Sequence, residues 1–364
     1  MKELIDLTSD LIRFRSTADR PDEIRRCIDF IAAYLDKHDI GFKRFEYEGV
    51  PSIAALPRDK EAEILLLTHI DVVAGDPEQF EPFEREGRLY GRGSIDDKYA
   101  AALSLLLLKN HVERRRAKGG DQSALPFGIL ITGDEEVGGF KGAKKALAEI
   151  SARFCIAIDG GCVERIITKE KGMLVLRLTA KGRAAHGAYL WKGENAIEKL
   201  IDDAVKIRSL FTDNAEGHWH KTCNLGIISG GVAHNQVPDR AEAVFNIRYT
   251  ENDDVDGLIA EVRGLVESEV AVEIKEPVFT GGTTKYLELL RRASPESLVS
   301  FTHGASDARF LSEYGIDGVV WGANGDESAH GPDEHLNVAD GAKLYKYLDA
   351  FLSTVEENKE VRED

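Results

Sequence analysis

Three apolar runs in the first half of the chain each end at an acidic or imidazole side chain. They are AEILLLTHIDVV (62–73), FGILITG (127–133) and FCIAIDGG (154–161). Short apolar runs bounded by glycine and polar residues predict fully buried strands of a mixed, mainly parallel sheet. Between the first two lies IDDKYAAALSLLLLKNHVERRR (95–116), which predicts a helix with carboxylates capping its N-terminal end. We therefore expect an α/β fold with helices on both faces of the sheet.

The pattern of the chain changes near residue 170. GMLVLRLTAKG (172–182) alternates apolar and polar residues, as a half-exposed strand does. The following segments predict a helix, two strands, a helix and a strand, at 195–211, 222–231, 241–250, 255–270 and 271–277. This β-α-β-β-α-β order is typical of a ferredoxin-like α+β unit. We expect a discontinuous catalytic domain, residues 1–170 and 279–364, with a smaller domain inserted at 171–278.

Composition excludes several classes of protein. The chain has 364 residues, 43% hydrophobic and 30% charged, as a soluble globular protein of about two domains has. Its formal net charge of −17 argues against nucleic acid and anionic membranes as partners, because both attract basic patches. The N-terminus is broken by charges, and the longest apolar run (100–108) is too short to span a bilayer. Four scattered cysteines without a CxxC pair indicate reduced thiols, so we expect a cytoplasmic protein.

Several common catalytic motifs do not occur. The sequence contains no GxSxG, no GxxxxGK[ST] and no HExxH. GRGSID (91–96) approaches the dinucleotide-binding pattern, but aspartate replaces its last glycine and no strand is expected directly before it. We therefore do not interpret it as a nucleotide loop.

Oxygen and imidazole groups remain as the candidates for chemistry. Taken singly, each has an ordinary structural explanation. His69 with Asp71 fits a histidine hydrogen-bonded to a neighbouring acid, and Asp96 fits a helix N-cap. Asp159 fits a turn aspartate, and His330 an idle surface histidine.

Taken together, these residues favour a metal centre. Open α/β sheets bind ligands beyond the carboxyl ends of their strands. Two histidines and three carboxylates can hold two divalent ions that share a bridging carboxylate; they are His69, Asp96, Glu136, Asp159 and His330. Imidazole and carboxylate without thiolate suit zinc best, with cobalt or manganese as alternatives. An unrelated structural metal site stays open at this point.

The sequence resembles the M20 family of metallopeptidases and deacylases over essentially its whole length. The family includes succinyl-diaminopimelate desuccinylase, acetylornithine deacetylase, aminoacylase and glutamate carboxypeptidase. The resemblance rests on motifs in the family's order and spacing: THIDVV (68–73), GRGSIDDK (91–98), TGDEEVGG (132–139), AIDGG (157–161), GRAAHG (182–187), NQVPD (235–239), SDARF (306–310) and HGPDE (330–334).

The resemblance implies a role for each metal-site residue. Asp96 is expected to bridge two metals and to precede a cis peptide bond. His69 and Asp159 are expected to complete one metal position, and Glu136 with His330 the other. Two further residues are expected to act beside the metals. Asp71 is expected to accept the second N–H of His69, as metal-bound histidines require, and Glu135 to be the general base for the attacking water.

The inserted domain is expected to serve as lid and dimerisation domain and to bind substrate. By the resemblance, His186 supplies a donor to the tetrahedral oxyanion, often across a dimer. Asn235 and Arg248 are expected to hold a substrate carboxylate, and Arg309 is a second candidate anion clamp; a salt bridge is the alternative for both arginines.

Two departures from the family pattern affect these substrate contacts. Leu190 replaces the usual proline after His186 and is followed by Trp191, where bulky apolar groups suit either the substrate entrance or a dimer interface. Asn246 replaces a common aspartate two residues before Arg248.

These features predict a two-metal hydrolase that cleaves an amide bond of a small carboxylate-bearing substrate. N-acyl amino acids and short peptides fit this description. The alternative is a catalytically inactive M20-fold protein that binds a ligand or peptide, which the intact Glu135 and the full ligand set argue against.

Overall fold

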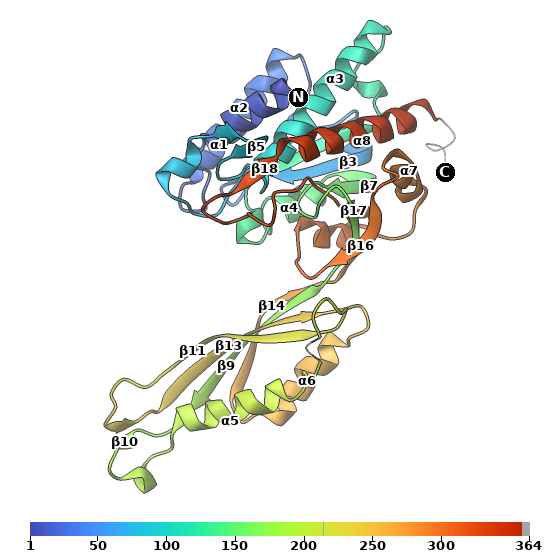
Figure 1. Ribbon diagram of the computed structural model, residues 1–364. Coiled ribbons are helices and arrows are strands. Elements are labelled where there is room, and N and C mark those ends of the chain that lie inside the picture. Colours follow the sequence, from blue (N-terminus) through green and yellow to red (C-terminus); the bar gives the residue numbers. More distant parts are fainter. Residues whose placement is uncertain (214, 359–364) are drawn as a thin grey trace. The chain divides into compact units, whose positions relative to one another are not determined.

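The computed structural model describes residues 1–213 and 215–358, and the chain divides into two compact units (Figure 1). The first unit comprises Met1–Lys169, Phe279–Thr302 and the chain from Ser306 on. The second comprises Glu170–Val278 together with His303–Ala305.

A large mixed sheet forms the centre of the first unit. Its strands are β1 (Lys43–Tyr47), β2 (Val50–Ala55), β3 (Glu61–His69), β6 (Phe127–Thr132), β7 (Ser151–Ala157), β8 (Arg165–Glu170), β15 (Phe279–Thr280), β16 (Leu298–Thr302) and β17 (Asp317–Val320). They follow the order β1-β2-β6-β3-β7-β17-β8-β15, with β16 beside β8. The four central strands β6, β3, β7 and β17 run parallel, whereas β2 and β8 join them antiparallel. The expected mixed, mainly parallel sheet is confirmed.

Helices cover both faces of this sheet. They are α1 (Lys2–Ile12), α2 (Pro21–Lys37), α3 (Lys98–Ala117), α4 (Ala143–Leu147), α7 (Lys285–Ala293) and α8 (Val338–Glu357). Side chains alternate along β3, so that Ile64 and Leu66 pack with α1, α2, α3 and α8, whereas Leu65 and Leu67 pack with α4 and the 3-10 helix η5 (Asp307–Tyr314). Both faces of β3 are therefore buried, which explains its almost unbroken apolar sequence.

A small antiparallel sheet joins the segment just before Asp96 to the C-terminal part of the chain. It consists of β4 (Phe83–Arg85), β5 (Arg88–Tyr90) and β18 (His335–Asn337) in the order β18-β5-β4. His335 pairs with Tyr90, so residues just after 90 and just before 335 are brought side by side.

The second unit has a four-stranded antiparallel sheet with two helices on one face (Figure 1). Its main elements are β9 (Gly172–Lys181), α5 (Ala196–Arg208), β11 (Thr222–Gly230), β13 (Arg240–Tyr249), α6 (Val255–Leu265) and β14 (Glu269–Glu276). The order β11-β13-β9-β14 places the first and third strands of the unit at the centre. This is the expected ferredoxin-like arrangement. A short pair, β10 (Ala185–His186) with β12 (Gln236–Val237), extends the unit.

The start of α3 differs from the sequence expectation. The helix begins at Lys98, and the N-cap residue Asp97 makes no capping hydrogen bond with its side chain. Its Oδ2 instead accepts a hydrogen bond from the backbone N–H of His69 at 3.3 Å. The expectation that the carboxylate of Asp97 caps this helix was wrong, because a neighbouring strand end offers a donor that the sequence pattern does not reveal.

Candidate metal centre

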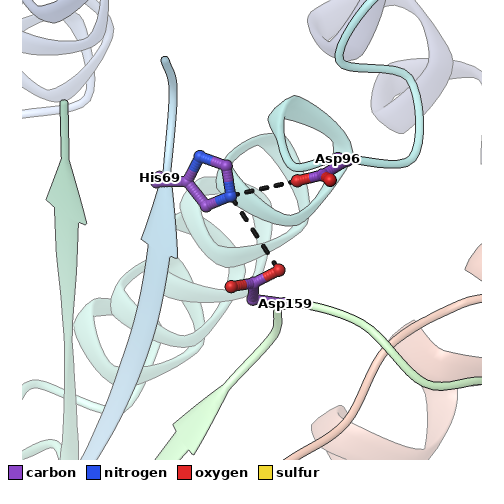
Figure 2. A group of neighbouring side chains, drawn as sticks. All are labelled: His69, Asp96 and Asp159. Atoms are coloured by element: carbon purple, nitrogen blue, oxygen red, sulfur yellow. Dashed lines mark ion pairs between the residues drawn. The ribbon is translucent and has the colours of Figure 1, made fainter. Parts of the chain in front are cut away.

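The candidate ligands gather at the carboxyl edge of the parallel sheet. Strand β3 ends at His69, β7 ends two residues before Asp159, and β6 ends three residues before the 3-10 turn η3 (Glu135–Val137). Because these strands are parallel neighbours, their carboxyl ends lie at one edge of the sheet. Figure 2 shows the His69 ring at the end of its strand, with Asp159 from the next strand and Asp96 from the segment before α3.

The first ligand group contains His69, Asp96 and Asp159. The Nε2 atom of His69 lies 3.1 Å from Oδ1 of Asp96 and 3.9 Å from Oδ1 of Asp159 (Figure 2). Only 1% of the His69 side chain is exposed. The peptide bond after Asp96 is cis, as the family resemblance implied.

The second ligand group contains Asp96, Glu136 and His330. The Nε2 atom of His330 lies 3.0 Å from Oδ2 of Asp96 and 3.2 Å from Oε1 of Glu136. Asp96 thus belongs to both groups and directs one carboxylate oxygen to each histidine.

The side chains of both groups are able to hold metal ions. His69 Nε2 and Glu136 Oε1 are buried and have no hydrogen-bond partner, although charged atoms lie close to both. Buried polar atoms rarely lack a partner, and an unsatisfied one marks a place where an ion belongs. Within each group the potential ligand atoms lie within 4.8 Å of one another, and all are nitrogen or oxygen. Such donors suit zinc.

Comparison with known proteins identifies the family. The sequence profile of Peptidase family M20/M25/M40 matches residues 65–354. The chain belongs to this family. It is therefore a hydrolase of amide or peptide bonds, as the sequence motifs predicted.

Relatives of this M20 enzyme carry different names. A succinyl-diaminopimelate desuccinylase from Xanthomonas oryzae pv. oryzae is 28% identical, over 93% of this chain and 95% of the relative. A protein from Aspergillus clavatus named "Probable carboxypeptidase" is also 28% identical, over 93% of this chain and 85% of the relative.

Solved structures share the fold of this M20 enzyme. The M20 metallo-carboxypeptidase Sso-CP2 from Sulfolobus solfataricus superposes with a TM-score of 0.80 at 17% identity, covering 98% of this chain and 100% of that one. The aminopeptidase PepT from Bacillus cereus gives a TM-score of 0.77 at 20% identity, covering 97% and 98%.

Burial and neighbouring charges shift the pKa values of several residues in and beside the ligand groups. Burial, and next the charge of Asp96, raises the pKa of Glu136 to about 7. Burial and the charge of Asp159 hold the pKa of Glu135 well above its usual range. Contact with Asp96 raises the pKa of His330 to about 9. Close carboxylates that take up protons so readily are also groups whose mutual repulsion a bound dication would offset.

Asp71 connects the first ligand group to the glutamate turn. Its backbone oxygen lies 3.1 Å from His69 Nδ1, and its carboxylate Oδ1 lies 3.4 Å from the same nitrogen. The two carboxylate oxygens accept the backbone N–H groups of Glu135 at 3.1 Å and Glu136 at 2.9 Å. One buried acid therefore orients the histidine and fixes the turn that carries the glutamates.

Sequence reasoning gave no role to Arg92 and Glu334, although both lie inside quoted motifs. They form a buried ion pair, 3% and 1% exposed. Both residues contact the segments that carry Asp96 and His330. The only sequence signal for Arg92 was a charged residue inside a glycine-rich motif. The sequence alone does not show that this charge is buried, because burial depends on the tertiary fold.

Arg309 is also buried, at 3% exposure. Its guanidinium donates to the backbone oxygen of Gly138 at 2.7 Å and of Ser306 at 2.6 Å, and it lies over the Phe310 ring. Asp307, likewise buried, has its Oδ1 atom 3.9 Å from this guanidinium, and burial raises the pKa of Asp307 to about 7. These contacts connect η5 to the end of the glutamate turn.

The remaining expected residues lie in the second unit. His186 is exposed and pairs with Gln236 across β10 and β12, and its Nδ1 accepts the N–H of Ala188 at 3.1 Å. Asn235 is exposed, and its backbone oxygen accepts the N–H of Gly187 at 2.7 Å, which holds it beside the His186 segment. Arg248 is half-buried on β13.

Two bulky residues follow His186 on the surface. Leu190 is 64% exposed and Trp191 is 74% exposed. Across the described residues, no helix combines the length and apolar character needed to cross a membrane.

Proposed function

We propose that the chain is a two-metal amidohydrolase that acts on N-acyl amino acids or short peptides with a free carboxylate. One observation carries this proposal: each carboxylate oxygen of Asp96 faces a different histidine, His69 at 3.1 Å and His330 at 3.0 Å. A single aspartate placed between two imidazoles is the arrangement of a carboxylate that bridges two metal positions.

The residues divide the reaction between them. Two zinc ions, when bound, lower the pKa of a water and polarise the scissile carbonyl. His69 and Asp159 hold one position, Glu136 and His330 the other, and Asp96 both. Glu135 takes the proton of the attacking water on its carboxylate and passes it to the leaving nitrogen.

Three groups are proposed to contact the substrate from the second unit. His186 donates an N–H to the tetrahedral oxyanion, in its own chain or in a partner chain. Arg248 and Asn235 hold the substrate carboxylate, since a guanidinium binds a carboxylate through two parallel hydrogen bonds. Arg309 donates to two backbone oxygens and is buried, so we assign it to the support of the glutamate turn instead.

The names of the relatives motivate the substrate class. One relative is named a desuccinylase and another a carboxypeptidase. Both names describe cleavage of an amide bond in a small molecule or peptide that carries a carboxylate, and we extend that class to this chain.

We further propose that two copies associate through the second unit. Strand β11 is an edge strand of its sheet, and Ile227 and Ile228 on it are 59% and 51% exposed. Ile201 and Val205 on α5 are 48% and 64% exposed. An apolar edge strand and helix are costly in water, and a second copy covers both. Replacing Val205 and Ile228 by aspartate together is expected to convert a dimer into a monomer in light scattering.

The cysteines are in keeping with a reducing compartment. Cys27, Cys155, Cys162 and Cys223 are all free thiols. Together with the sequence expectation, this supports a cytoplasmic location, which subcellular fractionation tests.

The proposed reaction is tested by an activity screen with defined metals. Wild type is assayed with zinc, cobalt and manganese on N-succinyl, N-acetyl and N-formyl amino acids and on dipeptides, each beside the matching carboxamide that lacks the free carboxylate. We expect hydrolysis of at least one acid and at least tenfold weaker hydrolysis of its carboxamide, corresponding to the loss of one charge-assisted pair.

The glutamates provide the matched control. Glu135→Gln is expected to keep both zinc ions and to lose about 10²- to 10⁴-fold in kcat, the contribution of a general base. Glu136→Gln is expected to lose zinc. If wild type and Glu135→Gln are equally inert over the whole panel, the proposed reaction is wrong.

A further inference from the structure

A buried ion pair outside the ligand groups contacts both segments that carry the second metal position. Arg92 precedes Asp96 in the chain, and Glu334 follows His330. Nη1 of Arg92 donates to Oε2 of Glu334. Both side chains are almost completely removed from solvent, at 3% and 1% exposure.

Glu334 holds the backbone that leads to Asp96. Its Oε1 atom accepts N–H groups from Gly93 at 2.8 Å, from Ile95 at 3.3 Å and from Asp96 itself at 3.3 Å. The backbone oxygen of Glu334 accepts the N–H of Gly91 at 3.0 Å. The Glu334 carboxylate therefore fixes the backbone of residues 93–96, which lie just before α3, through three hydrogen bonds.

Arg92 holds the backbone of His330. Its Nη2 atom donates to the backbone oxygen of His330 at 3.2 Å and of Ala74 at 3.4 Å. His330 has a φ of 64°, a left-handed conformation that a non-glycine residue adopts only when its surroundings impose it. Gln79 adds a second contact, since its amide donates to the backbone oxygen of Gly331 at 3.0 Å.

The two ligands that belong to the first position alone, His69 and Asp159, have other supports, and only the shared Asp96 connects that position to these contacts. His69 lies at the end of β3, with its backbone N–H on Asp97 and its Nδ1 beside Asp71. Within the described part of the chain, the side chains of Arg92 and Glu334 form no hydrogen bond with His69, Asp71 or Asp159. The two metal positions thus have different supports.

An ion pair is an expensive way to fill a buried space, because both charges leave water. An apolar pair of the same size would leave three backbone N–H groups and the His330 oxygen without these partners. The ion pair therefore satisfies backbone groups that apolar side chains of the same size would leave without partners.

We propose that Arg92 and Glu334 are positioning residues that set the spacing between Asp96 and His330 and so determine the affinity of the second metal position. This inference rests on the proposed two-metal function. Neither residue is proposed to touch metal or substrate. Both act through the backbone of a ligand-bearing segment.

The test is the change Glu334→Gln, which keeps the size of the side chain but replaces one of its two oxygens by an NH2 group. Either Arg92 or the backbone N–H groups of the 93–96 segment then lose their acceptor. Zinc per chain and the two dissociation constants are measured by metal analysis and chelator competition. We expect the zinc at the second position, the more weakly bound of the two, to lose about 10- to 100-fold in affinity. Residues that hydrogen-bond to metal ligands typically contribute this much. The other zinc is expected to bind as in wild type, kcat to fall, and KM to change by less than about threefold.

Asp349→Asn is the matched control for general destabilisation. Asp349 pairs with His111 and Arg114 and joins α3 to α8 away from the ligand groups. This variant is expected to lower the thermal midpoint and to leave both zinc affinities unchanged. Equal weakening of both zinc ions in Glu334→Gln, or wild-type affinity for both, overturns the inference.

Arg92→Lys is a second variant that keeps the charge but loses the fork that reaches His330. If Glu334→Gln does not fold, this variant decides: a selective loss of affinity of at least about threefold supports the inference, and no loss overturns it. A wild-type protein that binds fewer than two zinc ions contradicts the proposed function instead.

Discussion

The two candidate ligand groups, the two halves of the proposed metal centre, share Asp96 but are built differently. His69 lies at the end of a strand buried on both faces, and its side chain is 1% exposed. His330 lies in a loop with left-handed backbone, and its side chain is 53% exposed. In the first half, Asp71 and Asp97 contact a histidine that a sheet strand already places. In the second half, Arg92 and Gln79 contact the backbone of the loop that carries His330. We therefore expect the second half to lose its metal first and to respond more to changes outside the ligand set.

The largest effect is expected at the residue that both halves share. Asp96→Asn removes the charge that faces both histidines, so both metal positions weaken at once. Loss of metal-assisted charge stabilisation of several kcal/mol corresponds to a decrease in kcat/KM of about a thousandfold or more. Steady-state kinetics with zinc analysis checks this. Retention of both zinc ions with normal turnover would show that Asp96 does not bridge.

A paired histidine change separates the two halves. His69→Ala and His330→Ala are each expected to remove one zinc and to lower activity at least about a hundredfold. Their effects on the metal-free fold differ, because only His69 is buried. We expect His69→Ala to lower the free energy of unfolding by about 1–3 kcal/mol, from unsatisfied Asp71 and lost packing. The exposed His330→Ala should cost less than about 1 kcal/mol. If denaturant titrations give equal losses of unfolding free energy for the two variants, the two histidines do not differ in their contribution to the fold as proposed.

Raised pKa values in both ligand groups make the stability of the metal-free protein depend on pH, and His330 and Glu136 are the two residues of the second group whose pKa is raised. The folded pKa of His330, about 9, lies above its unfolded value of about 6.5, so its stabilisation is complete below pH 6.5 and is lost as pH rises to about 9. The folded pKa of Glu136, about 7, lies above about 4.5, and its contribution is lost in the same direction between those values. Both signs agree.

The thermal midpoint of chelator-treated protein is therefore expected to fall as pH rises from about 5 to 9. The zinc-loaded protein should change less over this range, because a dication replaces the protons that hold the acids together. A metal-free midpoint that rises with pH would contradict the electrostatic description of the second half.

The smallest effect is expected from the support of the glutamate turn. Arg309→Lys keeps a charge but cannot reach both backbone oxygens. We expect kcat to fall about three- to tenfold with KM unchanged within about twofold, for acid and carboxamide substrates alike. Arg248→Lys is the contrasting variant, expected to raise KM for the acid alone. A selective KM increase in Arg309→Lys would instead make Arg309 a substrate clamp.

The same contrast explains what could be predicted from the sequence. His69 and Asp159 follow apolar runs, so the end of each run predicts their place at the carboxyl edge of the sheet. The ferredoxin-like unit was predicted from its alternating pattern and helix order. These features depend on local periodicity, which the chain displays directly.

Features that depend on burial of charge could not be predicted. Glu334 and Asp97 are acids in polar segments, and the sequence gives no sign that each accepts backbone N–H groups of a distant segment. Arg309 is a candidate anion clamp by its motif, and the sequence gives no sign that its guanidinium donates to the backbone oxygen of Gly138. Asp97 contacts the backbone of His69 and Glu334 contacts the segment that leads to Asp96, so such contacts occur in both halves of the proposed centre.

The most direct test of the central claim is anomalous diffraction at the zinc edge from crystals of the zinc-loaded protein. We predict two anomalous peaks about 3.5–4 Å apart, one on each side of the Asp96 carboxylate. The peak beside His330 should disappear first when crystals are soaked in a weak chelator. A single peak, or two peaks that Asp96 does not bridge, would contradict the account.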